Sequence, residues 1–303
     1  MRPVNCSLCG SPKHRVYAAE SGTRNLHGVW VRCMDCGLFY ANPRASMEEI
    51  SDYYARYYEE GEFSSYLDDP EVERLALIEG AKMAGRIKET VPKGKFLDVG
   101  FGVGFMMKAA LDAGFEVWGN EISPSARAHA AERWGVPSQR LKTGTLEAAM
   151  FDDEMFDCVF AWHIIEHVSD LGVFMDELSR VLKPGGLLVL GTENNRNLHD
   201  IIGRTISFAR GRVPKFPTAA EHTFGFTLPV LKRLLNNSGF SITSSRIYED
   251  NWLGSYLRKP DAPRLGKRAK QWFDLIFRRY PLYLAGKLVK IGRMVEVFAV
   301  KEG

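Results

Sequence analysis

Apolar and polar positions along the chain follow two different periods, and the change falls near residue 93. Residues 70–91 repeat apolar side chains at helical spacing from Leu75 to Ile87, and Pro92 ends this pattern. Beyond it, apolar runs of strand length alternate with amphipathic stretches of helical length. Strands separated by helices form parallel sheets, so the pattern predicts an α/β fold with a doubly wound sheet.

The apolar runs and amphipathic stretches define the expected elements. Strands are expected at residues 95–100, 115–122, 156–162, 186–192, 240–249 and 294–302. Helices are expected at residues 105–114, 125–135, 173–182 and 228–239. A chain of 303 residues has room for one medium-sized domain and a small accessory unit.

Residues 1–45 are short segments punctuated by cysteine and glycine, with too few apolar residues for a core of their own. They hold two Cys-x-x-Cys pairs, Cys6 with Cys9 and Cys33 with Cys36, separated by 23 residues. Each pair is followed by a glycine that permits a tight turn. Four thiolates on two such turns are typical of structural zinc, so we expect a zinc-ribbon-like module here. Free or redox-active thiols are the alternative.

A glycine-rich turn follows the strand at residues 95–100. Gly100, Gly102 and Gly104 alternate with other residues before the next helix, and Asp98 precedes them. Dinucleotide sites use a different glycine spacing and bind a diphosphate, whereas a leading carboxylate suits a cationic ligand. S-adenosylmethionine carries an ammonium and a sulfonium and lacks a diphosphate. Glu121, at the end of the following strand, is placed to accept hydrogen bonds from both ribose hydroxyls.

Four motifs occur in the order found in class I S-adenosylmethionine-dependent methyltransferases, which residues 93–303 resemble. They are DVGFGVG at 98–104, NEIS at 120–123, FDCVFAWHIIEHV at 156–168 and LKPGGLLVL at 182–190. The resemblance implies a Rossmann-like methyltransferase domain whose last strand is antiparallel. It also implies an enzyme that transfers a methyl group.

The resemblance assigns cofactor contacts to the ends of successive strands. The methionine end is assigned to Asp98, Gly100, Phe101, Gly102 and Gly104. Glu121 is assigned to the ribose, and Ile122 to the face of the adenine. The remaining cofactor contacts are assigned to Thr145, Leu146, Glu147, Ala161, Trp162 and His163.

The segment from His163 to His167 is the candidate acceptor site. On a helix, His163 and His167 would share a face at i, i+4, with Glu166 beside them. Glu166 or His167 could serve as the base that deprotonates the acceptor. The cluster could instead bind a divalent cation, or Glu166 and His167 could cap a helix. His222, ahead of the helix at 228–239, is a further candidate catalytic residue, since similar methyltransferases have a histidine there that faces the substrate pocket.

The N-terminal sequence CSLCG…VRCMDCGLFYANPR resembles that of bacterial methyltransferases acting on sugars and other secondary metabolites. Sugar C-methyltransferases have a further C-terminal domain, which this chain is expected to lack. Residues 46–92 are expected to form a helical linker or lid. Its tyrosines would cover the site or pack in a core; they are Tyr53, Tyr54, Tyr57 and Tyr58.

Basic charge is concentrated in an insertion at about residues 252–293, which has 11 Lys and Arg against 2 Asp. Its basic residues are interleaved with aromatic ones, which suits peripheral contact with a membrane or an anionic substrate. An amphipathic helix with a solvated basic face is the alternative. Arg204, Arg210, Arg212 and Lys215 could extend this positive surface.

The sequence therefore favours methyl transfer from S-adenosylmethionine to a small molecule, such as a sugar or an anionic or lipid-linked sugar, at O or C. An RNA methyltransferase is the main alternative, because basic charge also suits nucleic acid. A non-catalytic scaffold that binds the cofactor is the other. Neither a signal peptide nor a membrane span is expected, so the predicted location is the cytoplasm, with peripheral contact at the inner membrane face.

Overall fold

The structure is a computed structural model, and it describes residues 3–18, 29–45, 49, 70–211, 222–249 and 292–303. The expected tyrosine lid and most of the basic insertion lie outside the described residues, as do Arg212 and Lys215.

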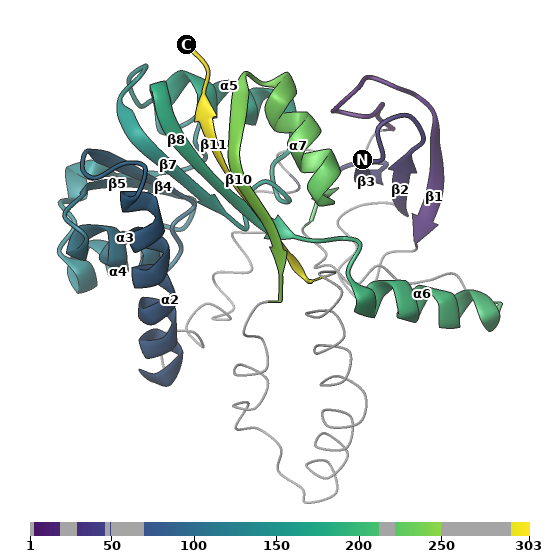
Figure 1. Ribbon diagram of the computed structural model, residues 1–303, viewed down its shortest axis with the longest axis horizontal. Coiled ribbons are helices and arrows are strands. Elements are labelled where there is room, and N and C mark those ends of the chain that lie inside the picture. The colour runs from purple at the N-terminus through teal and green to yellow at the C-terminus, as the bar shows by residue number, and fades with distance from the viewer. Residues whose placement is uncertain (1–2, 19–28, 46–48, 50–69, 212–221, 250–291) are drawn as a thin grey trace, which may run out of the picture.

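A seven-stranded sheet forms the centre of the molecule (Figure 1), in the order β10-β11-β8-β7-β4-β5-β6. Its strands are β4 (Lys95–Val99), β5 (Glu116–Glu121), β6 (Leu141–Thr143), β7 (Phe156–Trp162), β8 (Leu182–Glu193), β10 (Phe240–Tyr248) and β11 (Met294–Lys301). The strands from β8 to β6 are parallel, whereas β11 runs antiparallel to both β8 and β10. The predicted Rossmann-like sheet with an antiparallel last strand is therefore confirmed.

Helices cover both faces of this sheet. They are α2 (Pro70–Lys88), α3 (Phe105–Asp112), α4 (Pro124–Trp134), α5 (Leu171–Val181) and α7 (Leu228–Asn237), and a 3-10 turn lies at Ser138–Arg140. Helix α6 (Leu198–Ala209) follows β8 and lies to one side of the sheet (Figure 1). Helix α6 was not expected from the sequence. Alternate residues of β8 enter two different cores: Leu187 and Val189 join the core that includes residues of α2, α3 and α4, whereas Leu188 joins that of α5 and α7. This alternation is what buries the central strands on both sides.

The N-terminal residues build a second sheet in the order β1-β2-β3-β9. Its strands are β1 (His14–Ala18), β2 (Val29–Cys33), β3 (Phe39–Asn42) and β9 (Phe224–Gly225). Strand β9 comes from the segment just before α7, about 180 residues after β3. The sequence did not predict this pairing, which makes the N-terminal module and the segment around His222 parts of one sheet.

One expected element is absent. Residues 163–170 form turns and bends, so His163 and His167 do not share a helical face. His163 has a φ of +56°, and its amide still donates to the Gly191 carbonyl of β8 at 2.9 Å. The Glu166 carbonyl accepts hydrogen bonds from the amides of Thr223 and Phe224, at 2.7 and 3.0 Å. These bonds to β8 and β9 replace those of a helix.

Among the described helices, none is both long and apolar enough to cross a bilayer.

Candidate active site and cysteine cluster

The glycine turn lies at the carboxyl end of β4, where open α/β sheets place ligands. Gly100, Gly102 and Gly104 have φ values of +65°, +54° and +79°, which L-residues with a Cβ rarely adopt. The amide of Gly100 donates to the Asn120 carbonyl of β5 at 2.8 Å, which fixes the turn against the next strand. A Cβ on Gly100 would lie 2.2 Å from Ile164 Cδ1, whereas one on Gly102 would meet no atom within 4 Å. The space beside Gly102 is therefore the open side of the turn.

Asp98 lies beneath this turn and is only 3% exposed. Its Oδ2 atom has no hydrogen-bond partner among the described residues. Burial raises the pKa of the Asp98 carboxyl well above its usual value, and the negative charge of Glu121 raises it further. An unpaired buried carboxylate is costly by itself, and a cationic ligand would offset that cost.

Glu121, at the end of β5, joins the ends of three neighbouring strands. Its Oε2 accepts the Gly102 amide and its Oε1 the Ser123 amide, both at 2.9 Å. Its own carbonyl accepts the Gly144 amide at 2.9 Å, at the end of β6. Asn120, which the sequence analysis missed, adds a bond from its side chain to the Gly144 carbonyl at 3.1 Å. Carboxylate oxygens have several acceptor positions, so Glu121 can also accept ribose hydroxyls.

The other predicted cofactor residues follow the carboxyl ends of the strands and differ in how exposed their side chains are. Ile122 is 41% exposed, unusual for an isoleucine beside a buried strand end and suited to a flat apolar ligand. Leu146 and Ala161 are buried, whereas Thr145 and Glu147 are half-buried. Trp162 stacks on Phe160 with an interplanar angle of 2°, so part of its ring surface is used in packing.

Four polar side chains gather beyond the end of β7. The Nδ1 atom of His163 lies 2.9 Å from Glu166 Oε1, and the rings of His167 and His222 are 4.5 Å apart, edge to face. Glu166, His167 and His222 each place a possible ligand atom within 4.8 Å of the others. The structure therefore adds His222 to the predicted Glu166–His167 pair, although 54 residues lie between His167 and His222.

Glu166 is the charged centre of this cluster, and it is 1% exposed. Burial alone would raise the pKa of its carboxyl, but the hydrogen bond from His163 and the charges of the three histidines lower it to about 2. Its Oε2 atom has no hydrogen-bond partner among the described residues. Glu166 is thus held as a carboxylate with one oxygen available to a ligand.

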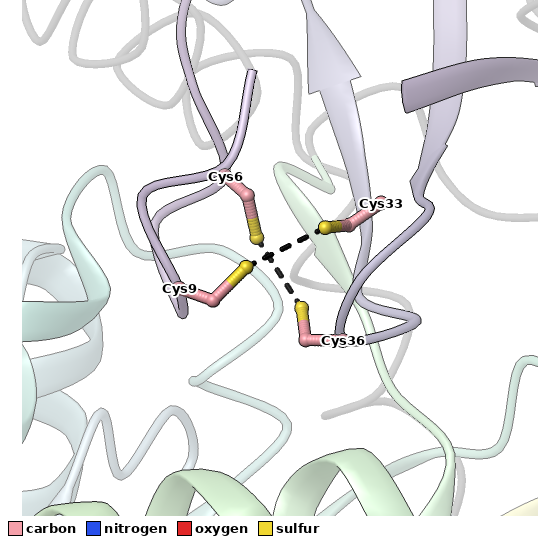
Figure 2. Close-up of side chains that lie close together, drawn as sticks. All are labelled: Cys6, Cys9, Cys33 and Cys36. Atoms are coloured by element: carbon pink, nitrogen blue, oxygen red, sulfur yellow. Dashed lines mark hydrogen bonds between the residues drawn. The ribbon is translucent and has the colours of Figure 1, made fainter. Parts of the chain in front are cut away.

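The four N-terminal cysteines converge on one point (Figure 2). The Sγ atoms of Cys6 and Cys36 are 3.4 Å apart, those of Cys9 and Cys33 are 3.6 Å apart, and all four lie within 4.8 Å of one another. Zn–S bonds of about 2.3 Å give sulfur separations of about 3.8 Å in a tetrahedron, so the spacing fits a zinc ion. None of the four forms a disulfide.

The two turns that present these cysteines repeat one pattern of hydrogen bonds. In the first turn the amide of Gly10 donates to the Cys6 carbonyl at 2.8 Å, and in the second that of Gly37 donates to the Cys33 carbonyl at 3.2 Å. Both glycines have positive φ, at 71° and 83°. The glycines expected after each pair therefore close the turns that aim the sulfur atoms inward. Cys158 is buried in β7, as expected of a core residue.

Residues 97–190 match a family model described as a methyltransferase domain. This match covers about a third of the chain and is with the methyltransferase domain alone. The matched residues include the glycine turn, Glu121 and the segment from His163 to His167.

Two curated relatives match the same part of the chain. The ubiquinone biosynthesis O-methyltransferase of Bradyrhizobium sp. (strain ORS 278) is 38% identical over 104 residues, which is 33% of this chain and 40% of the relative. The 2-methyl-6-phytyl-1,4-hydroquinone methyltransferase of Synechocystis sp. is 39% identical over 114 residues, or 36% of this chain and 35% of the relative. The chain thus matches two fifths or less of the length of each.

The fold of the methyltransferase domain also occurs in solved structures. A 1,6-didemethyltoxoflavin-N1-methyltransferase from Burkholderia thailandensis, solved with bound 1,6-didemethyltoxoflavin and S-adenosylhomocysteine, has a TM-score of 0.52 and 16% identity. The similarity covers 89% of this chain and 98% of that one. A possible histamine N-methyltransferase from Thermotoga maritima has a TM-score of 0.50 and 18% identity, covering 84% of this chain and all of the other. At these identities the likeness concerns the fold alone.

We expect Asp98→Asn to weaken S-adenosylhomocysteine binding at least tenfold while stabilising the ligand-free protein at pH 7. Because the pKa of Asp98 is raised in the folded state, the folded protein holds the proton more tightly than the unfolded chain. Its stability therefore falls as pH rises from the unfolded pKa through the folded one. The asparagine side chain does not ionise, so the variant avoids this loss. We expect its free energy of unfolding to be about 1 kcal/mol larger at pH 7. Calorimetry and urea unfolding at pH 4 and pH 7 measure both effects. Unchanged affinity, or a stability gain no larger at pH 7 than at pH 4, would contradict this account.

A pair of alanine substitutions tests the open side of the glycine turn. Gly102 and Gly135 both have positive φ and room for a Cβ, but Gly135 ends α4 away from the strand ends. Each change should destabilise the protein by about 1 kcal/mol through backbone strain. Only Gly102→Ala should also reduce the affinity for S-adenosylhomocysteine, by more than tenfold, in a calorimetric titration. Equal affinities in the two variants would exclude the space beside Gly102 as the cofactor site.

Proposed function

We propose that this protein transfers the methyl group of S-adenosylmethionine to an oxygen of a small-molecule acceptor. The observation that carries the proposal is the pair of carboxylates at neighbouring strand ends, with Asp98 buried and incompletely paired beneath the glycine turn. Asp98 supplies the negative charge that a cationic ligand needs, and Glu121 supplies acceptors for the hydroxyls of its sugar. Ile122 and Leu146, with Thr145 and Glu147, would border the adenine.

S-adenosylmethionine supplies a methyl group bonded to a positively charged sulfur. As the acceptor oxygen bonds to the methyl carbon, the carbon–sulfur bond breaks and the acceptor proton passes to His167 or His222. A carboxylate with a pKa of about 2 is a weak base, so Glu166 suits a different role. It stabilises the imidazolium that forms when a neighbouring histidine takes the proton.

A second candidate for the same site is a divalent cation held by Glu166, His167 and His222. Their close approach and the unpaired Glu166 Oε2 support it. Such an ion would bind an acceptor hydroxyl and favour its ionised form. Within this proposal His163 orients Glu166 from outside the ligand set.

The relatives and the N-terminal module point to different classes of acceptor. The two curated relatives are named for ubiquinone biosynthesis and for a hydroquinone, so a ring hydroxyl is the acceptor group we favour. The sugar expected from the cysteine module stays a prediction, as do an anionic or lipid-linked acceptor and membrane contact through residues 252–293. Neither the RNA alternative nor the non-catalytic alternative gains support from the relatives.

We expect His167→Asn and His222→Asn to lower kcat about 100-fold, in the range of general acid–base catalysis, and to leave S-adenosylhomocysteine affinity within twofold. Transfer of labelled methyl groups to a panel of catechols, hydroquinones and nucleotide sugars supplies the assay. His129→Asn is the matched control, because His129 lies on α4 beside Trp134. Full activity in both site variants would exclude a histidine base. Loss of activity under chelation mild enough to leave the cysteine-bound zinc in place, restored by Mg²⁺ or Mn²⁺, would favour the cation.

We further propose that Cys6, Cys9, Cys33 and Cys36 hold one structural zinc ion. Metal analysis of the purified protein should give one zinc per chain, and the double change Cys33→Ser with Cys36→Ser should abolish it. Cys158→Ser is the control, since Cys158 is buried in β7, in a different core from Cys6 and Cys33. Zinc retained in the double variant, or lost in the control, would contradict the assignment.

A further inference from the structure

The cysteine module and the acceptor-side cluster meet at β9. Strand β3 pairs with β9 in antiparallel register, with Tyr40 opposite Phe224. His222 stands two residues before β9. Since β9 has only two residues, it has little stability of its own and depends on the strand it pairs with.

A continuous line of backbone hydrogen bonds runs from β3 to Glu166. The Ala41 amide donates to the Thr223 carbonyl at 3.0 Å, and the Thr223 amide donates to the Glu166 carbonyl at 2.7 Å. Ala41, Thr223 and Glu166 are at most 1% exposed. Buried hydrogen bonds of this kind are costly to leave unmade, so movement of β3 would displace the segment holding His222.

The position of β3 depends in turn on the cysteine turns. Only two residues separate Cys36 from β3, and the Cys33 amide donates to the Leu38 carbonyl at 2.9 Å. Cys6, Cys33 and Leu38 belong to the same buried cluster as Phe224 of β9 and residues of α7. The module therefore shares its core with the methyltransferase domain.

Arg44 provides a second connection between the same parts. Its side chain is nearly buried, and Nη1 donates to the Ser169 carbonyl at 2.7 Å, just after the His163–His167 segment. Its Nη2 donates at 3.1 Å to the hydroxyl of Ser7, which lies between Cys6 and Cys9. The guanidinium carbon lies 4.5 Å from the centre of the Phe224 ring in β9. One planar side chain thus contacts the first cysteine turn, the acceptor-side loop and β9.

The cofactor side has no comparable link among the hydrogen bonds of the described residues. The glycine turn and Glu121 are held by bonds among β4, β5 and β6. The hydrogen bonds that hold the two halves of the candidate active site therefore come from different parts of the chain.

We propose that the four-cysteine module is the positioning frame of the acceptor half of the active site. Metal bound by the four cysteines fixes β3, and β3 and Arg44 together hold His222 and Glu166 in place. Arg44 is a positioning residue. The roles of His222 and Glu166 rest on the proposed methyl transfer, whereas the mechanical coupling rests only on the proposed zinc site.

Hydrogen–deuterium exchange on the full-length protein tests the coupling directly. Zinc-loaded protein is compared with protein treated with a chelator and with the Cys33→Ser, Cys36→Ser double variant. We expect amide exchange to quicken at least tenfold at residues 222–226 and 163–168, as well as in the module. Exchange at residues 98–104 and 119–123 should change less than twofold. Cys158→Ser should behave as the wild type.

Arg44→Met gives a second test that leaves all four cysteines in place. It should retain zinc, quicken exchange at residues 222–226 at least fivefold and shift the pH profile of methyl transfer. Arg15→Met is the control, because Arg15 is exposed on β1. Arg44→Lys should restore less than half of the protection, since an ammonium cannot reproduce the two-pronged contact.

Two results would overturn the proposal. One is faster exchange confined to residues 3–18 and 29–45 after zinc removal, with residues 222–226 unchanged. The other is a uniform increase across both sheets in Arg44→Met, which would signify global destabilisation. Calorimetry with S-adenosylhomocysteine on the same samples tests the proposed function separately: a chain that shows the coupling but binds no cofactor refutes the function alone.

Discussion

The carboxylate of Glu121 holds the edge of the sheet on which the proposed cofactor site is built. Parallel strands end side by side, and their last backbone groups need partners that the sheet itself does not supply. Glu121 accepts two of these amides, one from the glycine turn and one from Ser123 at the start of α4. Its backbone carbonyl accepts a third amide, from Gly144. A single residue, through its side chain and its carbonyl, thus fixes the relative positions of the ends of β4, β5 and β6.

Both candidate sites include a buried carboxylate, but the surroundings shift the pKa values of the two carboxylates in opposite directions. Asp98 lies beside another acid, so burial and repulsion raise its pKa. Glu166 lies among three histidines, and the hydrogen bond from His163, together with the attraction of the histidines when they are protonated, lowers its pKa despite burial. The environment of Asp98 favours the binding of a positive charge, which a sulfonium cofactor would supply. That of Glu166 keeps a carboxylate ready to stabilise a protonated histidine. Under the proposed function, the groups around each carboxylate suit Asp98 to the cofactor and Glu166 to the acceptor.

The N-terminal module is continuous with the methyltransferase domain in both sheet and core. Strand β9 completes the module's sheet, and residues of the module lie in the same buried cluster as α5 and α7. A zinc site in such a position would do more than stabilise an appendage. It would substitute for the core that 45 residues lack, and so support the loop that carries His222.

Patterns within the sequence were enough to predict the doubly wound sheet, the glycine turn, the carboxylates at the ends of β4 and β5 and the cysteine pairs. Each depends on spacing within a few residues, or on the rule that parallel strands end at one edge, so local pattern is sufficient. The pairing of β9 with β3 and the approach of His222 to Glu166 became visible in the three-dimensional fold. The fold also replaced the expected helix at His163–His167 with a loop, because bonds to Gly191 and Thr223 engage the backbone there. Partners that come from strands distant along the chain leave no periodic signal in the sequence.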